Sequence, residues 1–248
     1  MIRIEKLTKR FGTTLAVDSL DLEIHPGEVF GFLGPNGAGK TTTIRMMVGL
    51  LRPTSGTVRY ENSTTSLDVR TEALAVRRQI GYIPDAPFLY EKLTGREHLQ
   101  FVGEIYQVEA DELEREINGF LDLFHLQEVA DQPIEGYSHG MRQKIVMASS
   151  LLHHPRFLVV DEPMVGLDPR SARLVKDLLT NLAKDQGATL FLSTHSLDVA
   201  EEVCDRVGII SNGRLIAVGP PGELAQKQGG AAARLEKVFL ELTEEEGG

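Results

Sequence analysis

The sequence contains one cysteine, no tryptophan and no long hydrophobic run. Because Cys204 has no second thiol to pair with, an internal disulfide is excluded, which fits a reducing compartment. Next to Val203 on an expected helix, Cys204 is predicted to be a small core residue rather than a nucleophile. The apolar stretches 29–33 and 157–160 are far shorter than the roughly 18 residues that a membrane span needs. Any membrane role would therefore depend on a partner.

Positive charge is also scarce. Lys and Arg total 26 against 36 Asp and Glu, which gives a net charge of −10. An acidic surface repels phosphate backbones, so nucleic acid is not expected as a main partner. The chain opens with alternating apolar and charged residues, so no secretory leader is expected. The 248 residues, 42% hydrophobic, indicate one large α/β domain or two small ones rather than a disulfide miniprotein or a repeat array.

The first third of the chain is predicted to be rich in strands. Residues 2–33 contain a stretch of alternating apolar and acidic residues followed by the unbroken apolar run 29–33, which is typical of a strand buried on both faces. A glycine-rich turn and a helix over 41–50 follow, so strand, loop and helix form the start of a parallel α/β unit. Further strands are expected at 57–60 and 80–83.

Helices are predicted from about residue 88 to residue 154. Thr94 with Glu97 forms a capping box, and Asp111 with Glu114 is expected to open a second helix. This region is interpreted as a helical insert at 88–154 between two parts of one core, 1–87 and 155–218. A helix-like tail is predicted at 219–248, with a small spacer at 229–233.

Strand character returns in the last third of the chain. The apolar runs 157–160 and 189–192 predict two more buried parallel strands, separated by a helix that Asp168 caps and Pro169 begins. The dipeptide at 212–213 is Asn-Gly, and it predicts a tight hairpin between strands at 207–211 and 214–218.

The turn after the buried strand 29–33 carries the first chemical motif. Residues 34–41 match G-x-x-x-x-G-K-T, and the strand before and helix after are the context that a phosphate-binding loop requires. The glycines let successive backbone N–H groups surround an anion, and the helix N-terminus adds partial positive charge. Lys40 is predicted to reach the β- and γ-phosphates, and the Thr41 hydroxyl to ligate Mg²⁺.

Two acidic residues follow the strand 157–160. Asp161 stands where a nucleotide's Mg²⁺ needs a carboxylate, at the end of a neighbouring buried strand. Glu162 comes next, placed to polarise a water molecule against the γ-phosphate, and Pro163 stops the strand. The alternative interpretation is a pair of solvated loop residues.

With these motifs in their order, the chain resembles an ATP-binding cassette (ABC) ATPase subunit over nearly its whole length. The most diagnostic segment is 137–144, Tyr-Ser-His-Gly-Met-Arg-Gln-Lys, which resembles the signature sequence of this family. The resemblance implies a P-loop NTPase core with a mixed, mainly parallel sheet, an N-terminal antiparallel β-subdomain and an inserted helical subdomain. It also implies ATP and Mg²⁺ as cofactors, and two subunits that each complete the other's nucleotide site with Ser138 and Gly140.

The resemblance assigns further residues to the site. Phe11 corresponds to the aromatic residue that stacks on adenine, although a core position is an equal alternative; Asp168 corresponds to a loop that contacts the partner subunit, and it is also a plain helix cap. His195 corresponds to the switch histidine that senses the γ-phosphate, and the implied catalytic set is Glu162, His195 and Lys40. The implied ATP-binding set is Phe11, Gly34, Asn36, Gly37, Ala38, Gly39, Lys40, Thr41, Thr42, Ser138 and Gly140, and the implied metal set is Thr41, Asp161 and Asp85.

Two positions depart from the family pattern. Asp85 stands after the strand 80–83 where the family usually has a glutamine, and a carboxylate cannot donate a hydrogen bond as an amide does. In the signature, His139 replaces the usual first glycine and Met141 the usual glutamine, so the second anion site could approach the phosphate less closely.

The resemblance is closest to ATPase subunits of bacterial type-two exporters. It predicts a peripheral protein on the cytoplasmic face of the membrane, paired with a second ATPase subunit and with separate transmembrane permease subunits. A soluble cassette ATPase acting in cluster assembly, DNA repair or translation is the alternative. A GTPase is set aside because no Asn-Lys-x-Asp segment follows the phosphate loop; residues 181–185 do not fit. Cargo and direction of transport are not encoded in these motifs.

Overall fold

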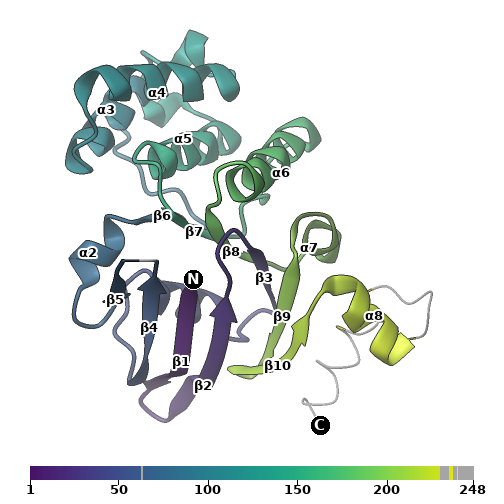
Figure 1. Ribbon diagram of the computed structural model, residues 1–248. Helices are drawn as coiled ribbons and strands as arrows, with labels where there is room; N and C mark the ends of the chain where they lie inside the picture. The colour runs from purple at the N-terminus through teal and green to yellow at the C-terminus, as the bar shows by residue number, and fades with distance from the viewer. Residues whose placement is uncertain (63, 230–234, 237–238, 240–248) are drawn as a thin grey trace.

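Two β-sheets and a layer of helices make up the molecule (Figure 1). The structure, a computed structural model, describes residues 1–62, 64–229, 235–236 and 239. The smaller sheet is antiparallel, in the order β2-β1-β4-β5. Its strands are β1 (Ile2–Phe11), β2 (Thr14–Ile24), β4 (Ser55–Glu61) and β5 (Ser66–Asp68).

The larger sheet has the order β10-β9-β3-β8-β7-β6. It is parallel except for β10, which pairs antiparallel with β9. Every residue of β3, β7 and β8 is buried, as the unbroken apolar runs predict. The predicted fold class is therefore confirmed. The strands are β3 (Val29–Leu33), β6 (Ile80–Ile83), β7 (Phe157–Asp161), β8 (Thr189–Thr194), β9 (Arg206–Ser211) and β10 (Arg214–Gly219).

The helix α1 (Lys40–Met47) follows the phosphate loop and packs in the core between the two sheets. It ends three residues before the predicted position. Gly49 takes a left-handed φ of 70°, the Leu50 N–H donates to the Arg45 carbonyl at 2.8 Å, and the Gly49 N–H donates to Met46 at 3.2 Å. This pair of backbone hydrogen bonds is the Schellman motif, which terminates the helix by satisfying its last carbonyls.

Helices α3 (Gly95–Ile105), α4 (Ala110–Leu123) and α5 (His139–Leu151) form the layer at the top of Figure 1. The capping box of α3 is confirmed, because Thr94 and Glu97 exchange both hydrogen bonds. The predicted start of α4 at Asp111 is wrong. The Glu109 carboxylate accepts from the N–H groups of residues 111 and 112, so the N-cap lies two residues before Asp111. Asp111 itself lies in the first turn of the helix, near the positive end of the helix dipole.

Among the remaining helices, α6 and α7 pack against β8, and α8 packs against β10. Asp168 caps α6, as predicted, and Asn212 and Gly213 both take positive φ in the predicted hairpin. Cys204 is buried directly after α7 and is a core residue. The elements are α2 (Ala73–Arg77), α6 (Pro169–Lys184), α7 (Leu197–Val203), α8 (Pro221–Gly229) and the 3₁₀ turns Gln127–Val129 and Ile134–Gly136.

Two parts of the sequence interpretation stay open. The spacer beyond Gly229 and most of the predicted tail lie outside the described residues, and the domain boundaries at 87/88 and 154/155 stay a prediction. Within the described parts of the chain, no helix combines the length and hydrophobicity needed to traverse a bilayer.

The β6 edge of the large sheet is covered by α5 and the residues that follow it. β6 is an edge strand, and the carbonyls of alternate residues along it accept side-chain hydrogen bonds. Gln143 Nε2 contacts the Pro84 oxygen at 3.4 Å, Ser150 Oγ donates to Tyr82 at 2.7 Å and His153 Nε2 lies 3.2 Å from the Ile80 oxygen. The helix that carries the signature is thereby attached to the strand that leads into Asp85.

Close packing at this edge makes Gly81 sensitive to substitution. A Cβ at residue 81 would lie 2.6 Å from the Ser150 carbonyl oxygen and 2.7 Å from Leu158 Cδ1. We expect Gly81→Ala to lower the free energy of unfolding by about 1–3 kcal/mol through overpacking. Gly119→Ala, in the exposed part of α4 with open space around it, should instead raise it by up to about 1 kcal/mol. Urea denaturation of both variants checks this contrast, and equal effects would contradict it.

Because His153 is partly buried, we expect the protein to lose stability in acid. Its ring stacks on Tyr106 with centroids 3.8 Å apart, and burial lowers the pKa of His153 from 6.5 to about 4. Below pH 6.5 the unfolded chain therefore binds a proton that the folded protein resists. The free energy of unfolding should fall by about 3 kcal/mol from this group as the pH drops from 6.5 to 4.

The test of this acid effect compares stability at several pH values in variants of the two adjacent histidines. His153→Phe retains an aromatic ring but cannot titrate, so its stability should decline less steeply between pH 6.5 and 4 than that of the unmodified protein. His154→Gln, at the half-exposed neighbouring position, is the matched control. An unchanged slope in His153→Phe would show that other groups carry the acid sensitivity.

Candidate functional site

A cavity of about 250 Å³ lies where β3, β6 and β7 end. The carboxyl ends of parallel strands share one edge of the sheet, which is where α/β proteins place their ligand sites. The described lining comes from β2, the phosphate loop, the start of α1 and the acidic residues at or just after the ends of β6 and β7. It consists of Ala16, Pro35, Asn36, Gly37, Gly39, Lys40, Thr41, Thr42, Asp85, Asp161 and Glu162.

The phosphate loop is held in its curled form by glycines. Gly37 and Gly39 have φ of 82° and 110°, which residues with a Cβ rarely adopt. A Cβ at Gly39 would also lie 2.6 Å from the Ala16 oxygen, and one at Gly34 would lie 2.4 Å from the Ile210 oxygen. The backbone itself is therefore brought close to the cavity, directly before the N-terminus of α1.

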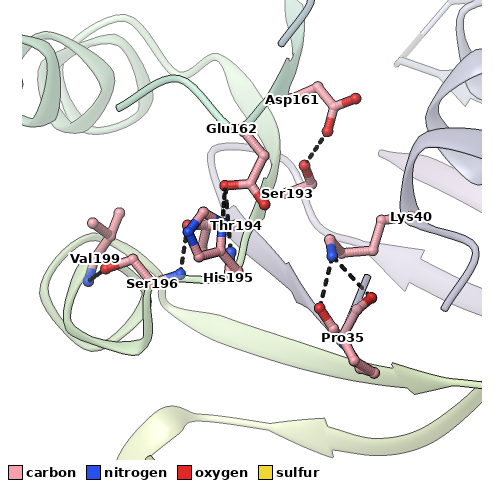
Figure 2. A network of polar contacts seen from close by, with 10 residues as sticks. Pro35, Lys40, Asp161, Glu162, Ser193, Thr194, His195, Ser196 and Val199 are labelled. Atoms are coloured by element: carbon pink, nitrogen blue, oxygen red, sulfur yellow. Dashed lines mark hydrogen bonds and ion pairs between the residues drawn. The ribbon is translucent and has the colours of Figure 1, made fainter. Parts of the chain in front are cut away.

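Lys40, drawn as sticks in Figure 2, is the first residue of α1, and it is buried. Its Nζ donates to the carbonyl oxygens of Gly34 at 2.6 Å and Pro35 at 3.3 Å. Burial lowers the pKa of Lys40, and the nearby carboxylates of Glu162 and Asp161 oppose that change. The ammonium group is thus fixed at the phosphate loop with two acids facing it.

Asp161 ends β7 and is 1% exposed. The Ser193 hydroxyl, from the adjacent strand β8, donates to Asp161 Oδ1 (Figure 2), while Oδ2 is buried and has no hydrogen-bond partner among the residues that the structure describes. Burial raises the pKa of Asp161, and the hydrogen bond from the Ser193 hydroxyl opposes that rise. One carboxylate oxygen is therefore satisfied within the protein and the other is not.

Glu162 turns away from the strand with a left-handed φ of 49°. Its backbone N–H donates to the Ser193 carbonyl at 3.1 Å. Its Oε2 lies 2.9 Å from Nδ1 of His195, which follows β8 (Figure 2). The structure thus brings together the predicted pair of Glu162 and His195, although the described cavity lining includes Glu162 and not the histidine.

Asp85 and Phe11 differ in their relation to the cavity. Asp85 is exposed, lines the cavity and accepts a hydrogen bond from the Ala86 N–H at 2.8 Å. Phe11 is 50% exposed at the end of β1, with Lys9 Nζ 4.9 Å from its ring centroid. The alternative that Phe11 is a core residue is therefore wrong. Its side chain is available at the surface but does not line the described cavity.

The signature residues lie at the start of α5. Ser138 is the N-cap, with its Oγ accepting from Met141 N at 3.3 Å, and Gly140 is in the first turn. Neither is part of the described cavity lining. His139 packs against the loop before α6: a Cβ at Gly166 would lie 2.3 Å from the imidazole Cδ2. The first turn of α5 and the loop before Asp168 are therefore in contact within one chain.

Asp168 caps α6 through both of its oxygens. Oδ1 accepts from the N–H groups of Arg170 and Ser171 at 3.0 Å, and Oδ2 accepts from the Ser171 hydroxyl at 2.6 Å. These hydrogen bonds, led by the Ser171 hydroxyl, hold the pKa of Asp168 below its usual value. The helix-cap interpretation of this residue is confirmed.

The residues around Asp161 suit a magnesium ion that also binds phosphate. In the described residues, no three His, Cys, Asp or Glu side chains converge to hold a metal by themselves. Mg²⁺ usually takes one or two protein oxygens together with substrate phosphates. The unpartnered, buried Asp161 Oδ2 and the Thr41 hydroxyl at the same cavity are oxygen donors of that kind.

Comparison with known proteins identifies the family. The family model for ABC transporters matches residues 17–165, which include the phosphate loop, the signature and the acidic strand end. The chain belongs to the ABC transporter family. It is an ABC transporter ATPase domain, as the motifs predict.

Several curated ABC proteins are similar over most of this chain. Nod factor export ATP-binding protein I of Ralstonia nicotianae is 38% identical over 90% of this chain and 68% of its own length. The daunorubicin/doxorubicin resistance ATP-binding protein DrrA of Streptomyces peucetius is 40% identical over 94% of this chain and 69% of its own. ABC transporter A family member 4 of Arabidopsis thaliana is 42% identical over 88% of this chain. The match spans only 23% of that longer protein.

Solved structures support the same assignment. A structure described as the ATP-binding subunit of an ABC transporter is 30% identical, with a TM-score of 0.90 over 98% of this chain and 99% of that one. CbiO1 of Clostridium perfringens, part of the ABC transporter complex cbiONQ, is 28% identical, with a TM-score of 0.77 over 90% of this chain and 89% of its own.

Sequence reasoning missed two residues at the site. Ala16 of β2 lines the cavity, and Ser193 of β8 holds Asp161. A signal for Ser193 was present, because a serine stands in an otherwise apolar buried strand and a buried hydroxyl needs a partner. No comparable signal marks Ala16, whose position depends on how the antiparallel sheet packs against the phosphate loop.

Proposed function

We propose that this chain binds MgATP at the cavity beside the phosphate loop and hydrolyses it to drive a transporter. The transporter we propose is an exporter. The observation that carries the proposal is the meeting of Lys40, Thr41, Asp161 and Glu162 around one cavity, contributed by two different strand ends. The phosphate loop supplies amides that bind an anion. The carboxylates of Asp161 and Glu162 supply the metal ligand and the general base that hydrolysis also needs.

Each residue takes a definite role in this proposal. The amides of residues 36–42 and the Lys40 ammonium bind the β- and γ-phosphates, while Thr41 and Asp161 hold Mg²⁺, with Asp85 as a further carboxylate lining the cavity. The ion, when bound, neutralises phosphate charge. Glu162 accepts a proton from the attacking water, and His195 holds the Glu162 carboxylate in place through its contact with Oε2.

We further propose that the pocket is completed by a second ATPase subunit. Ser138 and Gly140 lie at the N-terminus of α5, where helix amides favour an anion, but stand outside the described cavity lining, so they suit a γ-phosphate held by another chain. Closing two subunits around two ATP molecules and reopening after hydrolysis would supply the movement, because only a difference in ATP affinity between the two states can drive it. Phe11 is placed at the surface to stack on adenine.

An apolar surface on the helical layer suits separate membrane subunits. We define the docking surface as Phe88, Tyr90, Phe101 and Ile105, which are 83%, 60%, 39% and 61% exposed. Tyr90 and Phe101 form an edge-to-face pair with centroids 5.3 Å apart. Large apolar side chains gathered at a surface mark an interaction site. A permease helix seated there would hold the chain peripherally at the cytoplasmic face of the membrane.

The export role rests on the two bacterial relatives named for Nod factor export and for daunorubicin/doxorubicin resistance. Their descriptions favour transport over cluster assembly or DNA repair. The type-two exporter class fits the same relatives, and the cargo is selected by the membrane subunits.

The test of this function combines ATP turnover with membrane attachment. The chain and its membrane partner would be co-expressed, and both MgATP hydrolysis and recovery in the membrane fraction would be measured. Phe88→Asp with Tyr90→Asp should release the chain from membranes while leaving ATP binding intact, whereas Leu123→Asp, on α4 and 37% exposed, should not. Recovery only in the cytosolic fraction, with unimpaired ATPase activity, would overturn the transport proposal.

A further inference from the structure

The strand β8 contains a buried polar residue that the proposed mechanism does not yet use. Ser193 is 0% exposed and follows the fully buried Leu190, Phe191 and Leu192. Burying a hydroxyl group in an apolar core is unfavourable unless it forms a hydrogen bond. The other two hydroxyls of this strand accept hydrogen bonds from backbone N–H groups: Thr189 from Gly27 and Thr194 from Ser196. Ser193 is different because its partner is the Asp161 carboxylate.

Strand register makes this contact possible. Asp161 of β7 and Ser193 of β8 are direct neighbours in the parallel pairing, so their side chains lie on the same face of the sheet. The hydroxyl donates to Oδ1 (Figure 2), and Oδ2 of this cavity-lining residue is left buried without a partner in the described part of the chain. A carboxylate with one oxygen held in this way cannot rotate freely, and its remaining oxygen keeps a fixed direction.

We propose that Ser193 is a positioning residue that orients Asp161 for Mg²⁺ bound with nucleotide. This inference rests on the proposed function, because it takes Asp161 as a metal ligand. Hydrogen bonds to ligating carboxylates orient the ligand, and removing them typically lowers metal affinity by about 10- to 100-fold. The Ser193 backbone carbonyl separately accepts from the Glu162 N–H at 3.1 Å, and side-chain substitution keeps that bond. The hydroxyl therefore acts on the metal and not on the base.

The experiment measures metal binding rather than turnover alone. Mn²⁺ is titrated into the purified chain with ADP and followed by electron paramagnetic resonance, and the half-saturating Mg²⁺ concentration for ATP hydrolysis is measured in parallel. Ser193→Ala should raise both metal concentrations by about 10- to 100-fold. The maximal rate at saturating Mg²⁺ and the ADP affinity in EDTA should stay close to those of the unmodified protein, because the phosphate loop is untouched.

Matched variants separate the hydroxyl from packing. Ser193→Thr and Ser193→Val add nearly the same volume but differ in the hydroxyl, so Thr should retain the metal affinity that Val loses. If neither larger residue is accommodated, Ser193→Ala alone decides the matter. Ser149→Ala is the control for loss of a buried serine, since its hydroxyl bonds only to the Val146 carbonyl within α5. It should leave the Mn²⁺ titration unchanged.

Asp161→Asn distinguishes failure of this inference from failure of the proposed function. If Asp161→Asn abolishes Mn²⁺ binding while Ser193→Ala leaves it unchanged, Asp161 is a ligand that needs no positioning and the role of Ser193 is overturned. If Asp161→Asn also leaves Mn²⁺ binding unchanged, the metal site itself is misassigned and both proposals fail. A shift in Ser193→Ala together with loss in Asp161→Asn supports both.

Discussion

Replacing Glu162 with Gln is expected to lower ATP turnover by about 100- to 10,000-fold, the usual contribution of a positioned general base. The amide is nearly isosteric but cannot accept the proton of the attacking water. ATP binding should persist, because the Lys40 ammonium and the loop amides do not depend on Glu162 for their position. Phosphate release at saturating MgATP measures turnover, and equilibrium binding of a fluorescent ATP analogue measures affinity.

The same variant should accumulate as a closed dimer with ATP. Since reopening follows hydrolysis in the proposed cycle, blocking hydrolysis leaves the subunits joined, and size-exclusion chromatography with MgATP should show a doubled mass. Glu128→Gln, an exposed acid in the helical layer, is the control and should hydrolyse ATP at the normal rate. Normal turnover in Glu162→Gln would mean that the base is another group.

Mixed dimers of Lys40→Ala and Ser138→Ala subunits should retain activity that neither variant shows alone. If each pocket joins the Lys40 of one chain to the Ser138 of the other, a dimer with one variant in each chain still has one intact pocket. A dimer in which a single chain carries both changes has none. A site built within one chain predicts the opposite result for both dimers, so the pair of measurements separates the two arrangements.

The measurement needs dimers of known composition, obtained with two affinity tags and purified in sequence. Lys40→Ala removes a buried ammonium at the phosphate loop, and Ser138→Ala removes the N-cap hydroxyl of α5. An N-cap change costs about 1 kcal/mol in stability, so melting temperatures must be compared before rates are. Equal activity in the two mixed arrangements would contradict a composite pocket.

The large sheet was predictable because its strands are buried on both faces, and full burial imposes unbroken apolar sequence. The runs at 29–33, 157–160 and 189–192 became β3, β7 and β8 for that reason. Short elements with weak patterns escaped prediction: β5 has three residues and α2 has five. The start of α4 was misplaced because several acids compete for the N-cap, and the geometry chose Glu109.

The local motifs of the candidate site were predictable from the sequence, but the distances between residues of different motifs were not. The glycines, Lys40 and Thr41 act within one continuous loop whose conformation follows from the residues themselves. The contact of Glu162 with His195 joins residues 33 positions apart, and it depends on adjacent strands ending together. The position of Phe11 at the surface was likewise settled by the packing of β1.

The sequence by itself determined the class of fold, the phosphate loop and the acidic pair Asp161 and Glu162 at a strand end. Each of these follows from local backbone requirements or from a short run of residues. The tertiary structure alone decided which oxygen of Asp161 remains without a partner, since that depends on the pairing of β7 with β8 and on the Ser193 hydroxyl it brings alongside. Side-chain orientation in a buried site is set by neighbours distant in the chain, and only folding places them together.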